Sequence, residues 1–403
     1  MNRTTKRTPG TTLAMAFVAW YACEAAIAAE PYLPQSEDQV LLSLPIAAFG
    51  DGPDLPQLRN QLAEAGDDPQ AAVRLARRCL KLGAATGDAR YYGHSRAAIA
   101  PWWNESRWTD ETLDVLRIRA KLRERNHEYA EALADLATLL GRSPRDAQAW
   151  LETANLHRVR GDYEQAQLAC EALAEFADPF VMTLCRAPLL TVTRGPLQAL
   201  KSLDAMLPVA EVSSPESVTW ILTMQGEAAL AAGLSDVAER KFKQVLASEP
   251  ENRYVARAYA EQLIESGRPS DALNLVASRR QDDGLLLCEA LAARACGDAQ
   301  LVAELQQVIA DRFAEVRLRG DVPLGRFESI YVREFEHDAS RALRLALDNW
   351  NLQKEPHDTE AVLRAAIAAH DKDAAEPVAN FVRRHDVAHA TVKRLMEQWE
   401  RLP

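Results

Sequence analysis

Two pairs of segments in this chain carry the same residue types 34 positions apart, and this spacing restricts the possible folds more than any other feature of the sequence. The related pairs are Ala120 and Ala154, Tyr129 and Tyr163, Ala132 and Ala166, Gly226 and Ala260, Gly233 and Gly267, and Ala238 and Ala272. A fixed period of this length indicates small units of secondary structure that stack side by side. They must stack because no single unit can bury its own apolar face.

Each repeat has the pattern of two antiparallel helices joined by a tight turn. Ala154 and Ala166 leave room for two helices to cross closely, and the larger Trp150 and Tyr163 fill the remaining volume. Gly161 is suited to the turn because glycine adopts left-handed backbone angles without a steric cost. Ala and Leu, both strong helix formers, dominate the apolar residues, and no alternating run indicates a strand. The sequence therefore predicts an all-α fold.

The order of Trp150, Ala154, Gly161, Tyr163 and Ala166 resembles a tetratricopeptide repeat (TPR). The resemblance implies a right-handed α-solenoid of about nine or ten helical hairpins. It also implies a non-enzymatic scaffold that binds a protein or peptide partner in its concave groove. We expect the solenoid over residues 58–320, and further helical repeats with a polar cap over 321–403.

In the proteins that this chain resembles, the first helices of successive repeats line the groove, and fixed repeat positions face it. The resemblance places ten residues there: Arg117, Lys121, Arg125, Asn155, Arg158, Trp220, Glu227, Tyr254, Arg257 and Glu261. The first five form a basic neighbourhood with one amide, which would suit a carboxylate or an acidic peptide segment. The alternative is that these bases form ion pairs along their own helices with Asp114, Glu124 and Glu128.

The N-terminus has the pattern of an export signal. Arg3, Lys6 and Arg7 precede an apolar run over 13–23, and small residues at 26–29 provide a cleavage site. We expect a cleaved signal over 1–29, an extended lead-in over 30–57, and a periplasmic or secreted protein. The apolar run is too short to span a bilayer, so we expect no transmembrane span in the mature chain. A cytoplasmic regulatory adaptor is the alternative.

The chain is acidic, with 47 Lys and Arg against 58 Asp and Glu and a net charge of −11. We expect no nucleic-acid partner, because an acidic surface repels the phosphate backbone. The sequence contains no nucleophile elbow, phosphate-binding glycine loop, Cys-x-x-Cys or dinucleotide-binding motif. We therefore expect no enzymatic activity and no cofactor.

His385 and His389 are the one pair with the spacing of metal ligands on a helix, as in the zinc motif H-E-x-x-H. Asp386 stands where that motif has its catalytic glutamate, and no third ligand is close in the sequence. We expect no metal here. A metal-binding or hydrolytic protein built on this pair is the alternative.

Five cysteines follow the predicted signal: Cys79, Cys170, Cys185, Cys288 and Cys296. We expect them to act as small apolar fillers between helices. Cys170 and Cys185 are placed to meet across a turn between two helices, so a disulfide between them is the alternative. Cys288 and Cys296 lie in one helical stretch about 12 Å apart, too far for a disulfide.

Overall fold

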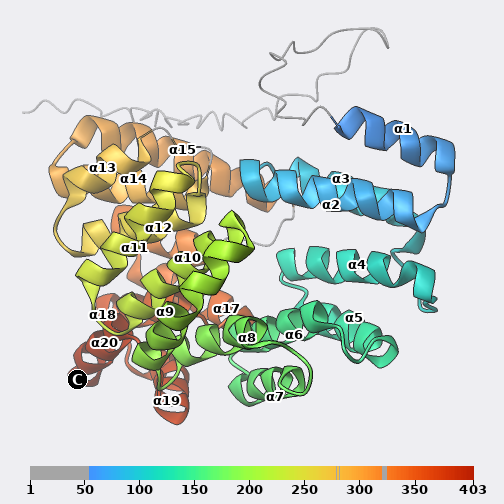
Figure 1. Cartoon of the computed structure of the whole chain (residues 1–403). Coiled ribbons are helices and arrows are strands. Elements are labelled where there is room, and N and C mark those ends of the chain that lie inside the picture. Colours follow the sequence, from blue (N-terminus) through green and yellow to red (C-terminus); the bar gives the residue numbers. More distant parts are fainter. Residues whose placement is uncertain (1–53, 278, 281, 320–324) are drawn as a thin grey trace, which may run out of the picture. The chain divides into compact units, whose positions relative to one another are not determined.

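The 34-residue period of the sequence becomes a succession of packed helix pairs in the computed structural model (Figure 1). The structure describes residues 54–277, 279–280, 282–319 and 325–403. Within these ranges the chain forms twenty α-helices and no β-strand. Helices adjacent in the sequence pack against each other along most of the described chain, as in the pairs α4–α5 and α6–α7. The predicted all-α solenoid of helical hairpins is confirmed.

The helix bounds are as follows. The first ten helices are α1 (Leu55–Ala65), α2 (Pro69–Thr86), α3 (Arg90–Ala98), α4 (Leu113–Arg125), α5 (Tyr129–Arg142), α6 (Ala147–Arg160), α7 (Tyr163–Leu173), α8 (Pro179–Val192), α9 (Pro196–Ser213) and α10 (Pro215–Ala231). The last ten are α11 (Ser235–Ser248), α12 (Arg253–Glu265), α13 (Pro269–Val276), α14 (Asp283–Cys296), α15 (Ala299–Arg319), α16 (Gly325–Tyr331), α17 (Ala339–Leu352), α18 (Pro356–Ala369), α19 (Glu376–His385) and α20 (Ala390–Glu400). Short helical turns are η2 (Ala100–Trp102), η3 (Asp110–Thr112), η4 (Val332–Glu336) and η5 (Asp373–Ala375).

Side-chain caps and glycines set many of these bounds. The carboxylate of Asp146 accepts the Ala149 N–H at the start of α6, which satisfies a donor that has no partner within the helix. Gly161, Gly233 and Gly267 adopt φ angles of 79°, 76° and 74° in the turns that separate paired helices. These left-handed angles explain why the repeat has glycine at this position.

The small residues of the repeat lie where the prediction places them. The seven alanines Ala120, Ala132, Ala154, Ala166, Ala238, Ala260 and Ala272 are all buried. Tyr129 and Tyr163 are also buried, whereas Trp150 is half-buried and donates its Nε1–H to the Pro144 carbonyl at 2.9 Å. Small side chains at the helix crossings allow the close packing that the repeat pattern indicates.

Gly226 provides a test of this close packing. A Cβ added to Gly226 in α10 would lie 2.3 Å from Cε1 of Phe242, a fully buried ring on α11. We expect Gly226→Ala to lower the free energy of unfolding by about 1–3 kcal/mol because the ring must move. Gly141→Ala in α5 is the matched control: nothing lies within 4 Å of its added Cβ, so it should be neutral or stabilise by up to about 1 kcal/mol. Equal effects in urea denaturation would contradict the close crossing.

Of the segments predicted for the N-terminus, the structure describes only the last residues of the lead-in. Helix α1 begins at Leu55, so residues 55–57 are helical and not part of an extended lead-in. Pro56 occupies the first turn of this helix, where its missing N–H costs nothing. The predicted signal over 1–29 and the remainder of the lead-in lie outside the described residues. None of the described helices is both long and apolar enough to cross a bilayer.

The C-terminal helices pack against the middle of the chain. The Lys354 N–H, between α17 and α18, donates to the Val159 carbonyl of α6 at 2.7 Å. Phe381 of α19 packs against Tyr163 of α7 with ring centroids 5.7 Å apart, and α20 contacts α10. We predicted further helical repeats and a polar cap for the end of the chain. In the structure these helices also contact α6, α7 and α10.

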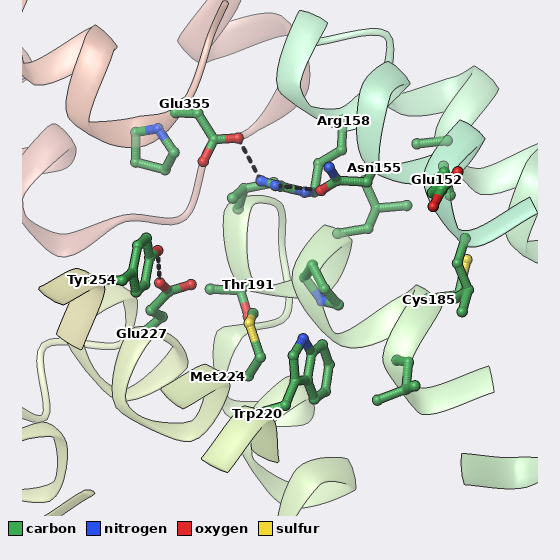
Figure 2. A pocket seen from close by; sticks show the side chains of 18 of the residues that line it. Glu152, Asn155, Arg158, Cys185, Thr191, Trp220, Met224, Glu227, Tyr254 and Glu355 are labelled. Carbon is green, nitrogen blue, oxygen red and sulfur yellow. Dashed lines mark hydrogen bonds and ion pairs between the residues drawn. The ribbon is translucent and has the colours of Figure 1, made fainter. Parts of the chain in front are cut away.

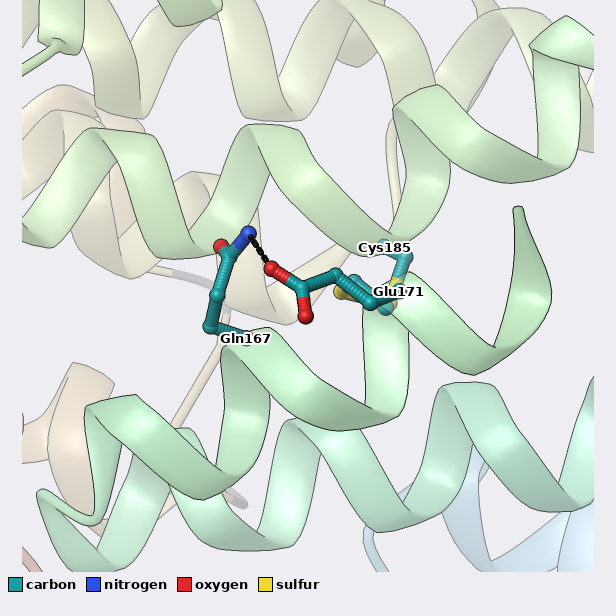
Figure 3. Close-up of a disulfide and its surroundings, with 4 residues drawn as sticks. Gln167, Glu171 and Cys185 are labelled. Atoms are coloured by element: carbon teal, nitrogen blue, oxygen red, sulfur yellow. Dashed lines mark hydrogen bonds between the residues drawn. A yellow bond between two sulfur atoms is a disulfide. The ribbon is translucent and has the colours of Figure 1, made fainter.

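A disulfide joins Cys170 of α7 to Cys185 of α8 (Figure 3). Their Cα atoms lie 5.7 Å apart, within the usual range for a disulfide. The expectation that these two cysteines act only as apolar fillers is therefore wrong, and the alternative is correct. Cys79 and Cys288 are buried, as expected, whereas Cys296 is exposed.

Removal of this disulfide should lower stability measurably. A cross-link between residues 15 positions apart restricts the unfolded chain and contributes about 3 kcal/mol. We expect Cys170→Ala with Cys185→Ala to lower the free energy of unfolding by about that amount, measured by urea denaturation without reductant. Dithiothreitol should destabilise the wild type similarly and leave the double variant unchanged; an equal effect on both would contradict the assignment.

Candidate functional site

A cavity of about 530 Å³ lies between the repeats and the start of α18 (Figure 2). Its walls come mainly from α4, α6, α8, α10 and α12, together with the segment that leads into α18. This volume is within the usual range of ligand pockets, about 300–1,000 Å³. A smaller cavity of about 230 Å³ shares Tyr254, Ala258, Glu355 and His357 with it.

Most of the predicted groove residues line these two cavities. Lys121, Asn155, Arg158, Trp220, Glu227 and Tyr254 line the larger cavity, and Tyr254, Arg257 and Glu261 line the smaller one. The structure places Arg117 and Arg125 outside both. Eight of the ten predicted positions therefore converge on one region of the described chain.

The bases that were expected to hold a carboxylate already have partners within the chain. Arg158 donates to Glu355 at 2.6 Å and to the Asn155 side-chain oxygen at 2.9 Å. Lys121 pairs with Glu124 three residues further along α4, as the alternative prediction has it. Arg158 therefore has its counter-ion from a segment that the repeat pattern does not include.

Arg117 and Arg125 also have contacts of their own. Arg117 pairs with Asp146 at the start of α6, and its distance to Asp114 on its own helix is 3.9 Å. The Arg125 guanidinium lies 4.3 Å from the centre of the Tyr92 ring, within range of a cation–π contact. Neither residue faces the cavity.

The electrostatics of the cavity keep Arg158 charged. Burial by itself lowers the pKa of Arg158, but the nearby carboxylates of Glu355 and Glu227 raise it above its ordinary value. A guanidinium in this setting donates fixed hydrogen bonds. It therefore connects α6 to the start of α18 across one side of the cavity.

Two other carboxylates on the cavity wall have no cationic partner among the described residues. Glu227 accepts a hydrogen bond from the Tyr254 hydroxyl, and Glu152 accepts one from Gln148 Nε2 at 2.9 Å. Burial raises the pKa of both Glu227 and Glu152, because a charged carboxylate loses hydration in this environment. These two carboxylates line the cavity without an ion pair to a described residue.

The rest of the wall is largely apolar. Trp220 and Met224 of α10 point into the cavity beside Thr191 of α8 (Figure 2). Leu184, Pro188, Leu189 and Val192 of α8 extend this surface. The disulfide partner Cys185 also lines the cavity, so the cross-link fixes α8, which forms one wall, to α7.

The two C-terminal histidines do not share one helix. Helix α19 ends at His385, Asp386 has a left-handed φ of 50°, and α20 begins only at Ala390. Because of this turn, the two side chains have different surroundings. Within the described ranges, no group of three or more His, Cys, Asp or Glu is placed to hold a metal ion.

His385 and His389 each have their own contacts. The His385 ring packs on Phe381 and Tyr163, with centroids 4.6 and 5.2 Å away. His389 Nδ1 lies 3.1 Å from Glu360 of α18 and its ring lies beside His357. His389 also lines the larger cavity.

Comparisons with known proteins give the same repeat assignment. The model of the tetratricopeptide repeat family matches residues 119–180 and 223–284, the two regions in which the 34-residue spacing occurs. No curated protein matches the chain.

Several solved structures are similar to the chain at low sequence identity. PilW, a type IV pilus biogenesis factor, is 20% identical and has a TM-score of 0.42, with 51% of this chain and 96% of PilW covered. A tetratricopeptide repeat protein from Parabacteroides merdae is 14% identical, with a TM-score of 0.41 and coverage of 61% and 93%. The human IFIT1 dimer with m7Gppp-AAAA is 11% identical, with a TM-score of 0.42 and coverage of 87% and 94%.

The family match, the buried repeat positions and the stacked helix pairs describe one architecture. The chain is a tetratricopeptide repeat protein with an all-α solenoid fold.

Proposed function

We propose that this protein is an interaction scaffold that holds a short segment of a partner protein in the larger cavity. The observation that carries the proposal is that groove positions from α4, α6, α10 and α12 all line this cavity. Repeat solenoids commonly use such inner surfaces for binding. The segment that leads into α18 occupies part of the same surface, so we propose a short segment and not an extended peptide.

A cavity-filling variant tests the proposal. Ala258 lines both cavities from α12, and Ala258→Trp should occupy the space without removing a polar contact. Val212→Trp, at a site that is 85% exposed, is the matched control. We expect a partner that co-purifies with residues 30–403 from the native cells to be lost with Ala258→Trp and kept with Val212→Trp. Retention by a folded Ala258→Trp variant, checked by circular dichroism, would refute the cavity as the binding site.

We further propose that the protein acts outside the cytoplasm. The signal-like pattern of residues 1–29 and the Cys170–Cys185 disulfide both support this, because disulfides persist mainly in oxidising compartments. N-terminal sequencing of the protein from its native cells should show that residues 1–29 are absent. Retention of Met1 in a reduced, cytoplasmic protein would favour the regulatory adaptor instead.

A further inference from the structure

Some charged side chains on the cavity wall have a counter-ion, and others do not. Both cations that line the larger cavity, Lys121 and Arg158, have carboxylate partners in Glu124 and Glu355. Glu227 and Glu152 form no ion pair with a described residue. A second anion entering the cavity would therefore meet unpaired negative charge, whereas a cation would gain a partner.

Of the two carboxylates, Glu227 is better placed to bind a cation. Its carboxylate lies beside the Tyr254 hydroxyl, which donates a hydrogen bond to it and fixes its orientation (Figure 2). Trp220, Met224 and Glu227 are spaced by four and three residues along α10 and all three line the cavity, so they share one face of the helix. This face presents an aromatic ring and a flexible thioether next to a carboxylate.

The chemistry of that face is specific for a positive charge carried on an apolar stem. A carboxylate in a partly desolvated site forms strong charge-assisted hydrogen bonds with an ammonium or guanidinium group. The face of a tryptophan ring attracts cations, and methionine adapts to stems of different shape. Glu227 interacts with Arg158 and His389 without forming an ion pair, so a cationic ligand in direct contact would offset the cost of burying this carboxylate.

We propose that the cavity binds a cationic group on an apolar stem, with Glu227 as its counter-ion, Tyr254 as the residue that positions Glu227, and Trp220 and Met224 against the stem. The group is an amine or guanidinium. It comes either from a basic side chain of the partner segment, in which case the inference rests on the proposed function, or from a free organic amine. The acidic peptide expected from the basic repeat positions is not the ligand that this wall favours.

Isothermal titration of the full mature chain with three probes tests the ligand class. The probes are hexylammonium, hexanoate, and the capped peptide acetyl-Ala-Lys-Ala-amide with acetyl-Ala-norleucine-Ala-amide as its neutral match. We expect hexylammonium or the lysine peptide to bind, and hexanoate and the norleucine peptide not to. Tighter binding of the lysine peptide identifies a partner side chain as the source, and binding of hexylammonium alone identifies a free amine. Preference for hexanoate would overturn the inference.

A matched pair of variants assigns the role of Glu227. Glu227→Gln keeps the shape and the acceptor for Tyr254 but removes the charge, and should weaken binding by about tenfold or more. Glu131→Gln, at an exposed site on α5 outside the cavity, should bind like the wild type. Equal affinity in the two variants would overturn the inference. If Ala258→Trp loses its partner while Glu227→Gln binds normally, the charge assignment fails and the scaffold proposal stands. If Glu227→Gln loses the cationic probe while Ala258→Trp keeps its partner, the scaffold proposal fails and the charge assignment stands.

Discussion

Replacing Asp135 with alanine is expected to lower the free energy of unfolding by about 3–5 kcal/mol, because it leaves a buried guanidinium without its counter-ion. Asp135 of α5 accepts hydrogen bonds from Arg119 at 2.6 and 3.0 Å and from Arg123 at 2.7 Å. Both Arg119 and Asp135 are buried. Arg119 also donates to the Trp103 carbonyl at 2.7 Å, so it cannot turn to solvent without further losses.

Urea denaturation of purified Asp135→Ala and Asp110→Ala measures this effect. Asp110 is the matched control: its side chain is 88% exposed and lies 3.7 Å from Arg142. An exposed pair of this kind contributes at most about 1 kcal/mol. Similar losses in the two variants would show that the Arg119–Asp135 pair is solvated in solution.

Replacing Glu360 with glutamine is expected to lower the free energy of unfolding at pH 7 by about 3 kcal/mol. Burial by itself raises the pKa of Glu360, but the His389 ring, 3.1 Å away, and the charges of His357 and Arg364 lower it to about 2. An acid whose pKa is lower in the folded state stabilises the fold above its ordinary pKa, here 4.5. That stability is lost as the pH falls from 4.5 to about 2.

The pH dependence distinguishes this effect from simple loss of packing. The difference between wild type and Glu360→Gln should be full at pH 7, smaller at pH 3, and absent near pH 2. Glu131→Gln should follow the wild type throughout. A difference that stays constant with pH would contradict the electrostatic explanation.

The contribution of Asp358 to stability depends on pH in the opposite direction and must be considered in the same titration. Burial raises the pKa of Asp358 to about 6, although Arg326 lowers it. Its contribution to stability is therefore full below its ordinary pKa of 3.8 and is lost as the pH rises through about 6. Because Asp358 is present in both proteins, comparing wild type with Glu360→Gln removes its contribution.

The sequence was most informative where contacts join neighbouring repeats. Gly161, Ala154 and Ala166 perform local tasks, a turn and a close crossing, that recur in every unit. The 34-residue period therefore predicts these turns and helix crossings directly. The positions that line the cavity were predictable for the same reason, since Asn155, Trp220 and Tyr254 occupy corresponding faces of first helices.

Contacts between distant segments were not predictable from the repeat. Arg158 and Glu355 are separated by 197 residues, and no period relates them. The sequence shows a basic patch, but the carboxylate that pairs with Arg158 comes from the segment before α18. The charge that remains free in the cavity could therefore not be deduced from the sequence.

The expectation that Cys170 and Cys185 act only as apolar fillers was wrong, and the spacing of His385 and His389 did not reveal the turn between them. A helical repeat accepts cysteine as an apolar filler, so only the 5.7 Å separation of the Cys170 and Cys185 Cα atoms decides for a disulfide. His385 and His389 have the right spacing for one helix face, but the chain turns at Asp386. A spacing rule holds only while the helix continues.

A double-mutant cycle between Arg158 and Glu355 tests most directly whether the segment before α18 closes the inner side of the repeats into a cavity. The free energies of unfolding of wild type, Arg158→Met, Glu355→Gln and the double variant are measured by urea denaturation at one pH and salt concentration. Residues in direct contact show coupling energies of about 0.5–3 kcal/mol, whereas distant, independent sites are additive. The structure predicts a favourable coupling of at least about 1 kcal/mol; additive effects of the two substitutions would contradict the closed arrangement.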